Sequence, residues 1–301
     1  MAGIISIFLV LHLGTIQQEE PFRIMNKYQI TYLDTCQLDQ IPVDRAPLKL
    51  YLLCVSEKAF GTPKVIPLIL TTAIIPLSYL ITTRITKNPI FGVITASILP
   101  ISKIFSLLGP TGALSADWAF FFLASLYMVY RKPVLVGPLY FVAIAAKGVP
   151  LLCLPIFAAW IISSDTTKKQ KITAGISLGV ATAMVLSVWA TGNSQLVQPD
   201  GIRMDYSQLD LHQLYYIFRN DLVMFPIIIL SIANCIMQKQ KMLLFSIIWF
   251  YSLVVTIPMF SIYMMYDYRM IPLIEFCAMA LGTIPKNRLM ISFYQKIRAH
   301  V

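Results

Sequence analysis

Charged side chains are scarce in this 301-residue chain: they make up 13% of the sequence, while hydrophobic residues make up 57%. A typical soluble domain has about a quarter charged residues, so this composition, with a mean hydropathy of +0.72, excludes an ordinary soluble domain. No long hydrophilic block separates the apolar stretches between residues 2 and 283, which leaves no room for a soluble domain within that range. We therefore expect a single polytopic membrane domain of the all-α class.

The usual sequence motifs of soluble enzymes are also absent. The chain has no G-x-x-x-x-G-K-[ST] phosphate loop, no G-x-G-x-x-G, no H-E-x-x-H and no C-x-x-C. Its three histidines, His12, His212 and His300, are far apart, and there is no D-x-D motif to hold a divalent cation for a nucleotide-sugar donor. A histidine-rich metal site and a soluble nucleotide-sugar donor are therefore disfavoured, and the sequence gives no support for a divalent metal.

Cysteine is the next scarce residue, with five in the chain. Cys153, Cys235 and Cys277 lie in apolar stretches, where a thiol behaves as a small hydrophobic group. Cys36 and Cys54 lie before the second apolar stretch, so the sequence leaves a disulfide between these two open.

Long apolar stretches are abundant. A spanning helix needs about 20 apolar residues, and Pro or Gly within it is tolerated where neighbouring helices satisfy the backbone. On this criterion the sequence predicts ten transmembrane helices within a domain of residues 1–285, followed by a basic cytoplasmic tail at 286–301. The predicted spans are 2–16, 64–83, 89–107, 114–130, 133–147, 149–164, 172–191, 222–238, 242–264 and 268–284. The first has no Lys or Arg before it and no A-x-A site after it, which favours a retained anchor over a cleaved signal peptide.

Basic and acidic residues alternate between successive gaps. Gaps after every second span hold thirteen of the 24 Lys and Arg residues, with Asp165 as their only acid: Arg84, Lys87, Arg131, Lys132, Lys168, Lys169, Lys171, Lys239, Lys241, Lys286, Arg288, Lys296 and Arg298. The opposite gaps hold Glu19, Glu20, Asp34, Asp39, Asp44, Glu57, Asp117, Asp200, Asp205, Asp210, Asp221 and Asp267. Because cytoplasmic loops are enriched in Lys and Arg, we expect both termini in the cytoplasm. The net charge of +10 then needs no nucleic-acid partner.

The segment from Pro47 to Phe60 is apolar but short. With Lys49 inside it and Glu57 and Lys58 near its end, it fits a helix lying on the outer membrane surface better than a further span. The two long gaps, 17–63 and 192–221, are both on the outer side, which favours function at the outer or lumenal face.

Charges near or inside the spans are the candidates for function, because charge at membrane depth is costly. Lys147 would either snorkel to the interface or bind an anionic headgroup. Asp117 begins the fourth span, where helix capping is the alternative to a functional role. Arg269 begins the tenth span, where an ion pair with Asp267 is the alternative.

Glu275 lies six residues deeper than Arg269 and needs a partner or a proton, so we expect Lys103, Lys147 or Arg269 near it. In the expected topology these three cations share the outer face with Asp117 and the acidic first loop. Cations that hold a phosphate, beside an acid that serves as a base, suit group transfer from a lipid phosphate.

The order of these features resembles the GT-C superfamily of integral-membrane glycosyltransferases, which use polyprenyl- or dolichyl-phosphate sugars as donors. The resemblance covers most of residues 1–285 and is carried by short motifs: Asp44-Arg45-Ala46-Pro47-Leu48, Phe60-Gly61, Pro76-Leu77-Ser78-Tyr79-Leu80, Ser115-Ala116-Asp117-Trp118-Ala119-Phe120-Phe121-Phe122, Arg131-Lys132-Pro133, Ala145-Ala146-Lys147, Leu154-Pro155, Tyr268-Arg269 and Pro272.

The resemblance implies a hexosyltransferase or mannosyltransferase that acts at the outer or lumenal face of the plasma membrane or endoplasmic reticulum. Where the family places an Asp just after the first span, this chain has Glu19 and Glu20, with Asp34 as the next acid. One of these would be the base. Asp117 would position the acceptor or a metal, and Lys103, Lys147 and Arg269 would hold the donor phosphate. The alternative from the residues is a non-enzymatic transporter or an accessory subunit of a membrane complex, in which Asp117, Lys147 and Glu275 line a path through the bilayer.

Overall fold

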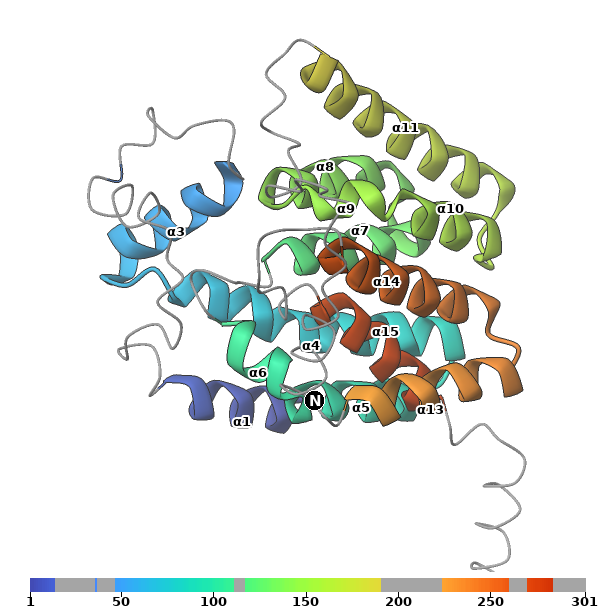
Figure 1. The fold of residues 1–301 in the computed structure, drawn as a ribbon, viewed down its shortest axis with the longest axis horizontal. Helices are drawn as coiled ribbons and strands as arrows, with labels where there is room; N and C mark the ends of the chain where they lie inside the picture. Colours follow the sequence, from blue (N-terminus) through green and yellow to red (C-terminus); the bar gives the residue numbers. More distant parts are fainter. Residues whose placement is uncertain (14–35, 37–46, 111–116, 191–223, 260–269, 284–301) are drawn as a thin grey trace, which may run out of the picture.

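The structure, a computed structural model, describes residues 1–13, 36, 47–110, 117–190, 224–259 and 270–283 (Figure 1). The described chain folds into thirteen α-helices and two short 3-10 helices and contains no β-strand. The predicted all-α class is therefore confirmed.

The helices follow the apolar stretches of the sequence in order. Their bounds are α1 Ala2–Leu13, α3 Pro47–Phe60, α4 Val65–Thr86, α5 Pro89–Ile98, η2 Leu99–Ile101, α6 Lys103–Leu108, α7 Asp117–Arg131, η3 Pro133–Leu135, α8 Val136–Ala146, α9 Val149–Leu152, α10 Leu154–Ser163, α11 Lys168–Ala190, α13 Met224–Met237, α14 Lys241–Met259 and α15 Ile271–Gly282. The predicted helix at 47–60 is present as α3 with those bounds, and each predicted span overlaps at least one helix.

The prediction of ten membrane-spanning helices is wrong as a count. Two helices in the described ranges are long and apolar enough to cross a membrane, Val65–Thr86 and Lys168–Val188, and seven further apolar helices are shorter. By length and composition alone, these two helices fit either a membrane or a protein core.

Breaks within the predicted spans explain part of this difference. The predicted span 89–107 is divided where η2 ends at Ile101, because Ser102 is extended and its hydroxyl accepts a hydrogen bond from the Phe105 N–H at 3.3 Å, which begins α6. The predicted span 149–164 is divided at Cys153, between a helix with Pro150 in its first turn and another with Pro155 in its first turn.

The core of the fold is aromatic and centres on α15, in which ten consecutive residues from Ile271 to Ala280 are buried. The Phe276 ring lies 6.0 Å from that of Phe250 in α14, 6.1 Å from that of Trp160 in α10 and 6.3 Å from that of Phe122 in α7. Aromatic rings at such centroid separations attract one another beyond their area burial. The red helix α15 thus packs with α7, α10 and α14, which come from earlier parts of the sequence (Figure 1).

A second close contact joins α8 to α11. The N–H of Gly137 donates to the Ser177 hydroxyl at 2.9 Å, and that hydroxyl donates to the carbonyl of Val134 at 2.7 Å. A Cβ atom at position 137 would collide with the backbone carbonyl of Ser177. The two helices approach this closely because residue 137 has no side chain.

Candidate functional site

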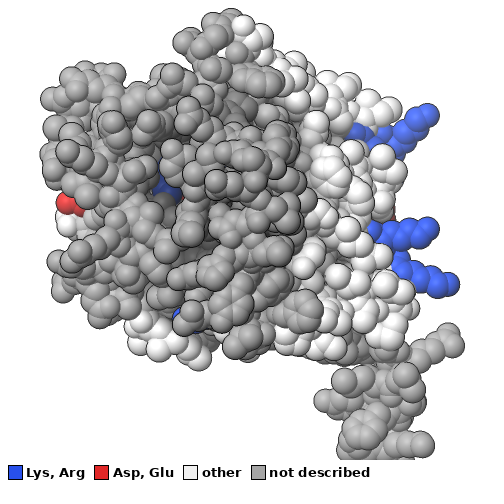
Figure 2. Space-filling model, viewed as in Figure 1, with Lys and Arg blue, Asp and Glu red and all other residues white. Residues whose placement is uncertain are grey.

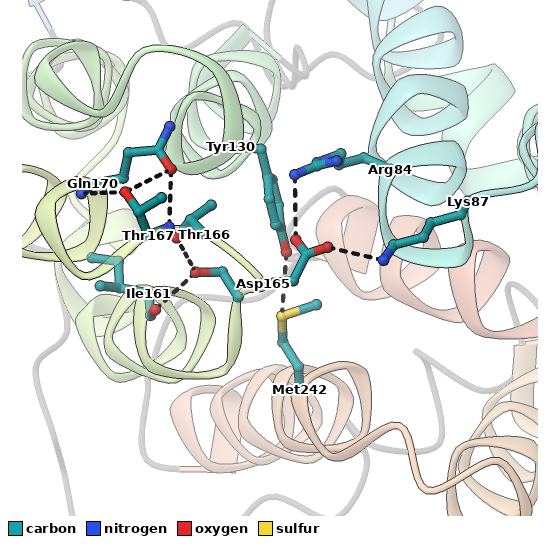
Figure 3. Close-up of polar contacts among 10 residues, drawn as sticks. Arg84, Lys87, Tyr130, Ile161, Asp165, Thr166, Thr167, Gln170 and Met242 are labelled. Carbon is teal, nitrogen blue, oxygen red and sulfur yellow. Dashed lines mark hydrogen bonds and ion pairs between the residues drawn. The ribbon is translucent and has the colours of Figure 1, made fainter.

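Four of the basic gaps meet at one end of the helical bundle. The Arg84 Nη2 atom at the end of α4 lies 3.4 Å from the Asp165 Oδ1 atom, which follows α10, and Lys87 Nζ lies 3.5 Å from Asp165 Oδ2. The Arg84 guanidinium also stacks over the Tyr130 ring of α7 at 5.6 Å, and the Tyr130 hydroxyl donates to the Met242 sulfur of α14 at 3.7 Å. Figure 3 shows Asp165 held between the two cations.

This basic end is open to the surroundings. Figure 2 shows Lys and Arg side chains projecting from one side of the molecule, with few acidic atoms among them. The side chains of Arg84 and Asp165 are 40% and 47% exposed, so their ion pair contributes little to stability. These charges therefore gather here because the basic gaps lie at the same end of the bundle, and their ion pairs do not stabilise the fold appreciably.

Asp117, at the start of α7, and Lys147, just after α8, are both at the end of the α7–α8 helical hairpin away from its turn. The Ser125 hydroxyl of α7 donates to the Val136 carbonyl of α8 at 2.7 Å, close to the turn between the two helices. Because the helices run antiparallel from that turn, the first residue of α7 and the last of α8 end at the same side of the bundle. Asp117 is 2% exposed and Lys147 is 9% exposed, so both charged residues are buried there.

Local structure explains how each residue is held. Asp117 stands in the first turn of α7, where a negative charge is favoured by the helix macrodipole. Lys147 is in the extended conformation between α8 and α9, and its N–H closes α8 by donating to the Ala143 carbonyl at 3.0 Å. Neither charge is without a partner, as expected for buried ionic groups.

A third buried charge, Lys49, was not predicted as a site residue. It is 6% exposed in α3, which packs against both α8 and α4. Figure 1 places α3 at the side of the bundle away from the Arg84 end of α4. The sequence signal was a lysine within the apolar first half of this 14-residue helix, and only the packing of the helix shows that the lysine is buried.

Of the other predicted site residues, only Lys103 is described. Lys103 is exposed at the start of α6. Glu19, Glu20, Asp34 and Arg269 lie outside the described residues, so their roles stay predictions.

Glu275 is fully buried in α15, as its place in the sequence suggested. Neither of its carboxyl oxygens has a hydrogen-bond partner among the residues described here. Of the three cations expected near it, Lys103 and Lys147 make no hydrogen bond to either carboxyl oxygen, and Arg269 lies outside the described residues.

Within the described ranges, no group of three or more His, Cys, Asp or Glu residues is arranged to hold a metal ion. The described residues offer instead two buried residues of opposite charge, Asp117 and Lys147, toward the end of the bundle opposite the exposed cations. A buried ammonium in a low-dielectric setting is suited to binding an anionic group. Comparison with protein-family models, curated proteins and solved structures finds no match to this chain.

Proposed function

We propose that the chain is a multi-pass membrane glycosyltransferase of the GT-C type, which transfers a sugar from a polyprenyl-phosphate donor to an acceptor at the outer or lumenal face. The observation that carries this proposal is the separation of charge along the bundle. Buried Asp117 and Lys147 lie at one end, and exposed cations from four gaps lie at the other.

The apolar surface supports a membrane environment. Ile172, Ile176, Val180 and Met184 of α11 are each more than half exposed and follow one another at intervals of four residues. Side chains at this spacing share one face of a helix, so they form a continuous apolar stripe. Soluble monomers rarely expose such stripes, whereas lipid tails would cover this one. The shorter apolar helices would then cross the bilayer in pairs or beside longer ones, as broken helices buried in protein can.

The basic end would face the cytoplasm, by the bias of Lys and Arg toward that side. The end with Asp117 and Lys147 would then face outward, together with the loop that contains Glu19, Glu20 and Asp34. This orientation brings the candidate acids and the candidate phosphate-binding cation to the same side.

In the proposed reaction, one of the three loop acids removes the proton from the acceptor hydroxyl, and the acceptor oxygen attacks the anomeric carbon of the donor sugar. The bond between that carbon and the phosphate oxygen breaks, and polyprenyl phosphate leaves. Lys147 holds the donor phosphate, with Arg269 and Lys103 as further cations. Asp117 orients the acceptor, with the first turn of α7 fixing its position.

The test is transfer by the purified protein in lipid nanodiscs, supplied with a panel of polyprenyl- and dolichyl-phosphate hexoses. We expect release of polyprenyl phosphate from at least one donor, and none from heat-treated protein. Failure of every donor in the panel, with protein that remains monodisperse, would count against the transferase.

A second candidate, a transporter, is favoured by Glu275 alone, since a fully buried carboxyl group inside a helical bundle is a default candidate for an ion or proton path. The two functions differ in what they require of this residue. The transferase makes no use of it, whereas a transporter with a path through the bundle would depend on it.

Replacing Glu275 by methionine separates these candidates. Because neither carboxyl oxygen has a hydrogen-bond partner in the described structure, an apolar side chain of similar size should raise the free energy of unfolding by about 1 kcal/mol or leave it unchanged. Transfer activity should remain close to that of the wild type. Thermal denaturation followed by size-exclusion chromatography, with a transfer assay, measures both. A large loss of transfer with normal stability would contradict the assigned roles.

A further inference from the structure

Two cysteine side chains from separate segments meet on α3. Cys54 is 1% exposed in the second half of this helix, and Cys36, which precedes the helix in the sequence, is 6% exposed. A side-chain hydrogen bond joins the two sulfur atoms. Because sulfur–sulfur hydrogen bonds are weak, this bond alone does not account for the position of Cys36.

Neighbouring contacts hold both residues in place. The Lys58 Nζ atom donates to the carbonyl oxygen of Cys36 at 3.2 Å, and Lys58 lies four residues after Cys54, on the same face of α3. The Ser56 hydroxyl donates to the Thr62 carbonyl at 2.8 Å and accepts from the Ile66 N–H at 3.2 Å, which ties α3 to the start of α4. Cys36 is thus docked on a helix that is itself anchored.

The remaining cysteines provide a contrast within the same chain. The other three cysteines are buried inside predicted spans: Cys153 between α9 and α10, Cys235 in α13 and Cys277 in α15. The Cys153 thiol donates to the Val149 carbonyl at 3.5 Å, as a packed core thiol does. Only Cys36 and Cys54 would lie on the outer side in the proposed orientation.

We propose that Cys36 and Cys54 form a disulfide bond in the mature protein. The proposal rests on the orientation given under the proposed function, because disulfides form and persist on the outer or lumenal side of membranes and not in the cytoplasm. In the structure both residues are thiols, which is the reduced form of the proposed disulfide.

The oxidant is a disulfide-bearing thiol–disulfide oxidoreductase of that compartment. One cysteine thiolate attacks a sulfur of the oxidoreductase disulfide, which gives a mixed disulfide and one released thiol. The second cysteine then attacks the mixed disulfide, which forms the Cys36–Cys54 bond and releases the second oxidoreductase thiol. Cys36 and Cys54 each lose their S–H bond, and the two electrons that they give up reduce the disulfide of the oxidoreductase to two thiols.

The order of folding and oxidation follows from burial. Burial, and next the hydrogen bond with Cys36, raise the pKa of the Cys54 thiol to about 12, so the folded protein offers little thiolate at neutral pH. Oxidation should therefore precede docking of Cys36 on α3. Once formed and buried, the bond should resist exchange with external thiols, as a structural disulfide does.

Mass spectrometry tests the proposal directly. Cells are quenched with acid, and the membranes are dissolved in a denaturant that contains N-ethylmaleimide to block free thiols and contains no reductant. The protein is then digested with trypsin. Cleavage after Lys27, Arg45, Lys49 and Lys58 gives the peptides 28–45 with Cys36 and 50–58 with Cys54. We expect these two peptides joined, with no maleimide on either, and separated by reduction. Maleimide on both peptides in unreduced wild-type protein would overturn the proposal.

Thiol counts with a maleimide–polyethylene glycol reagent provide the control. Unreduced, denatured wild-type protein should accept three labels, and reduced protein five, because the chain has five cysteines. Cys36→Ser should accept four labels without reduction, since Cys54 is released, whereas Cys153→Ser should accept two. Equal counts for the two variants would contradict the bond. The counts do not depend on activity, so loss of this bond and failure of the transferase are separate results.

Discussion

Replacing Lys147 by alanine should weaken binding of a polyprenyl-phosphate sugar by about 10- to 100-fold, which is the usual cost of losing a hydrogen bond to a charged group. The physical reason is its burial: at 9% exposure, the ammonium is poorly screened by water. Glu20→Gln should instead leave donor binding nearly unchanged and slow transfer. Titration of a fluorescent donor into protein in nanodiscs measures the binding constant for each variant.

Two further variants act as controls for this result. Lys87→Ala removes a lysine from the exposed basic end, where its side chain is 71% exposed, and should leave donor binding unchanged. Asp117→Asn keeps a residue that caps a helix well but removes its charge, so it should lower turnover more than it lowers donor affinity. If Glu20→Gln weakens donor binding more than Lys147→Ala does, the roles given to these residues are exchanged.

Gly137→Ala should lower the melting temperature by several degrees, which corresponds to about 1–3 kcal/mol for an overpacked contact. The added methyl group meets the Ser177 backbone, with the carbonyl carbon 2.6 Å away, and a backbone atom cannot move aside as a side chain can. Apparent melting temperatures from size-exclusion chromatography after heating give the measurement.

Gly175→Ala is the matched control, because position 175 lies on α11 near the same contact but has no atom within 4 Å of an added Cβ. There the better helix propensity of alanine should dominate and stabilise the protein by about 0.5–1 kcal/mol. Opposite signs for the two variants are expected. Equal destabilisation by both would show that α8 and α11 do not pack as described.

The helices were largely predictable, and their interruptions were less so. Apolar stretches marked α4 and α11 closely, because a run of apolar residues of that length needs few local signals. The division of residues 89–107 depends on Ser102 taking an extended conformation, and a serine between Pro100 and Phe105 fits either a broken or a continuous helix. Tertiary contacts decide between these, and a single sequence does not reveal them.

The candidate site was predictable only in part, because the sequence shows which charged residues are unusual but not which of them are buried. Asp117 and Lys147 stood out because charge is rare in this sequence, and antiparallel packing of α7 on α8 brings them to one end. The burial of Lys49 could not be predicted, since α3 presents lysines both toward and away from the bundle and only its packing distinguishes them: Lys49 is buried, whereas Lys58 is exposed. Glu275 was recognised as deep, but a single sequence does not show which of Lys103, Lys147 and Arg269 approaches it, and neither carboxyl oxygen has a hydrogen-bond partner among the described residues.

The most direct test of the proposed transferase is a single-turnover measurement with a donor whose sugar is radiolabelled, comparing wild-type protein with Lys147→Ala. The protein is in excess over the donor, and both proteins are followed at a protein concentration near the wild-type dissociation constant and at one well above that of the variant. We expect wild-type protein to transfer the label at both concentrations and the variant to fail only at the lower one, since Lys147 is assigned to donor binding. No transfer by the wild type, or equal transfer by both proteins at the lower protein concentration, would contradict the proposed function.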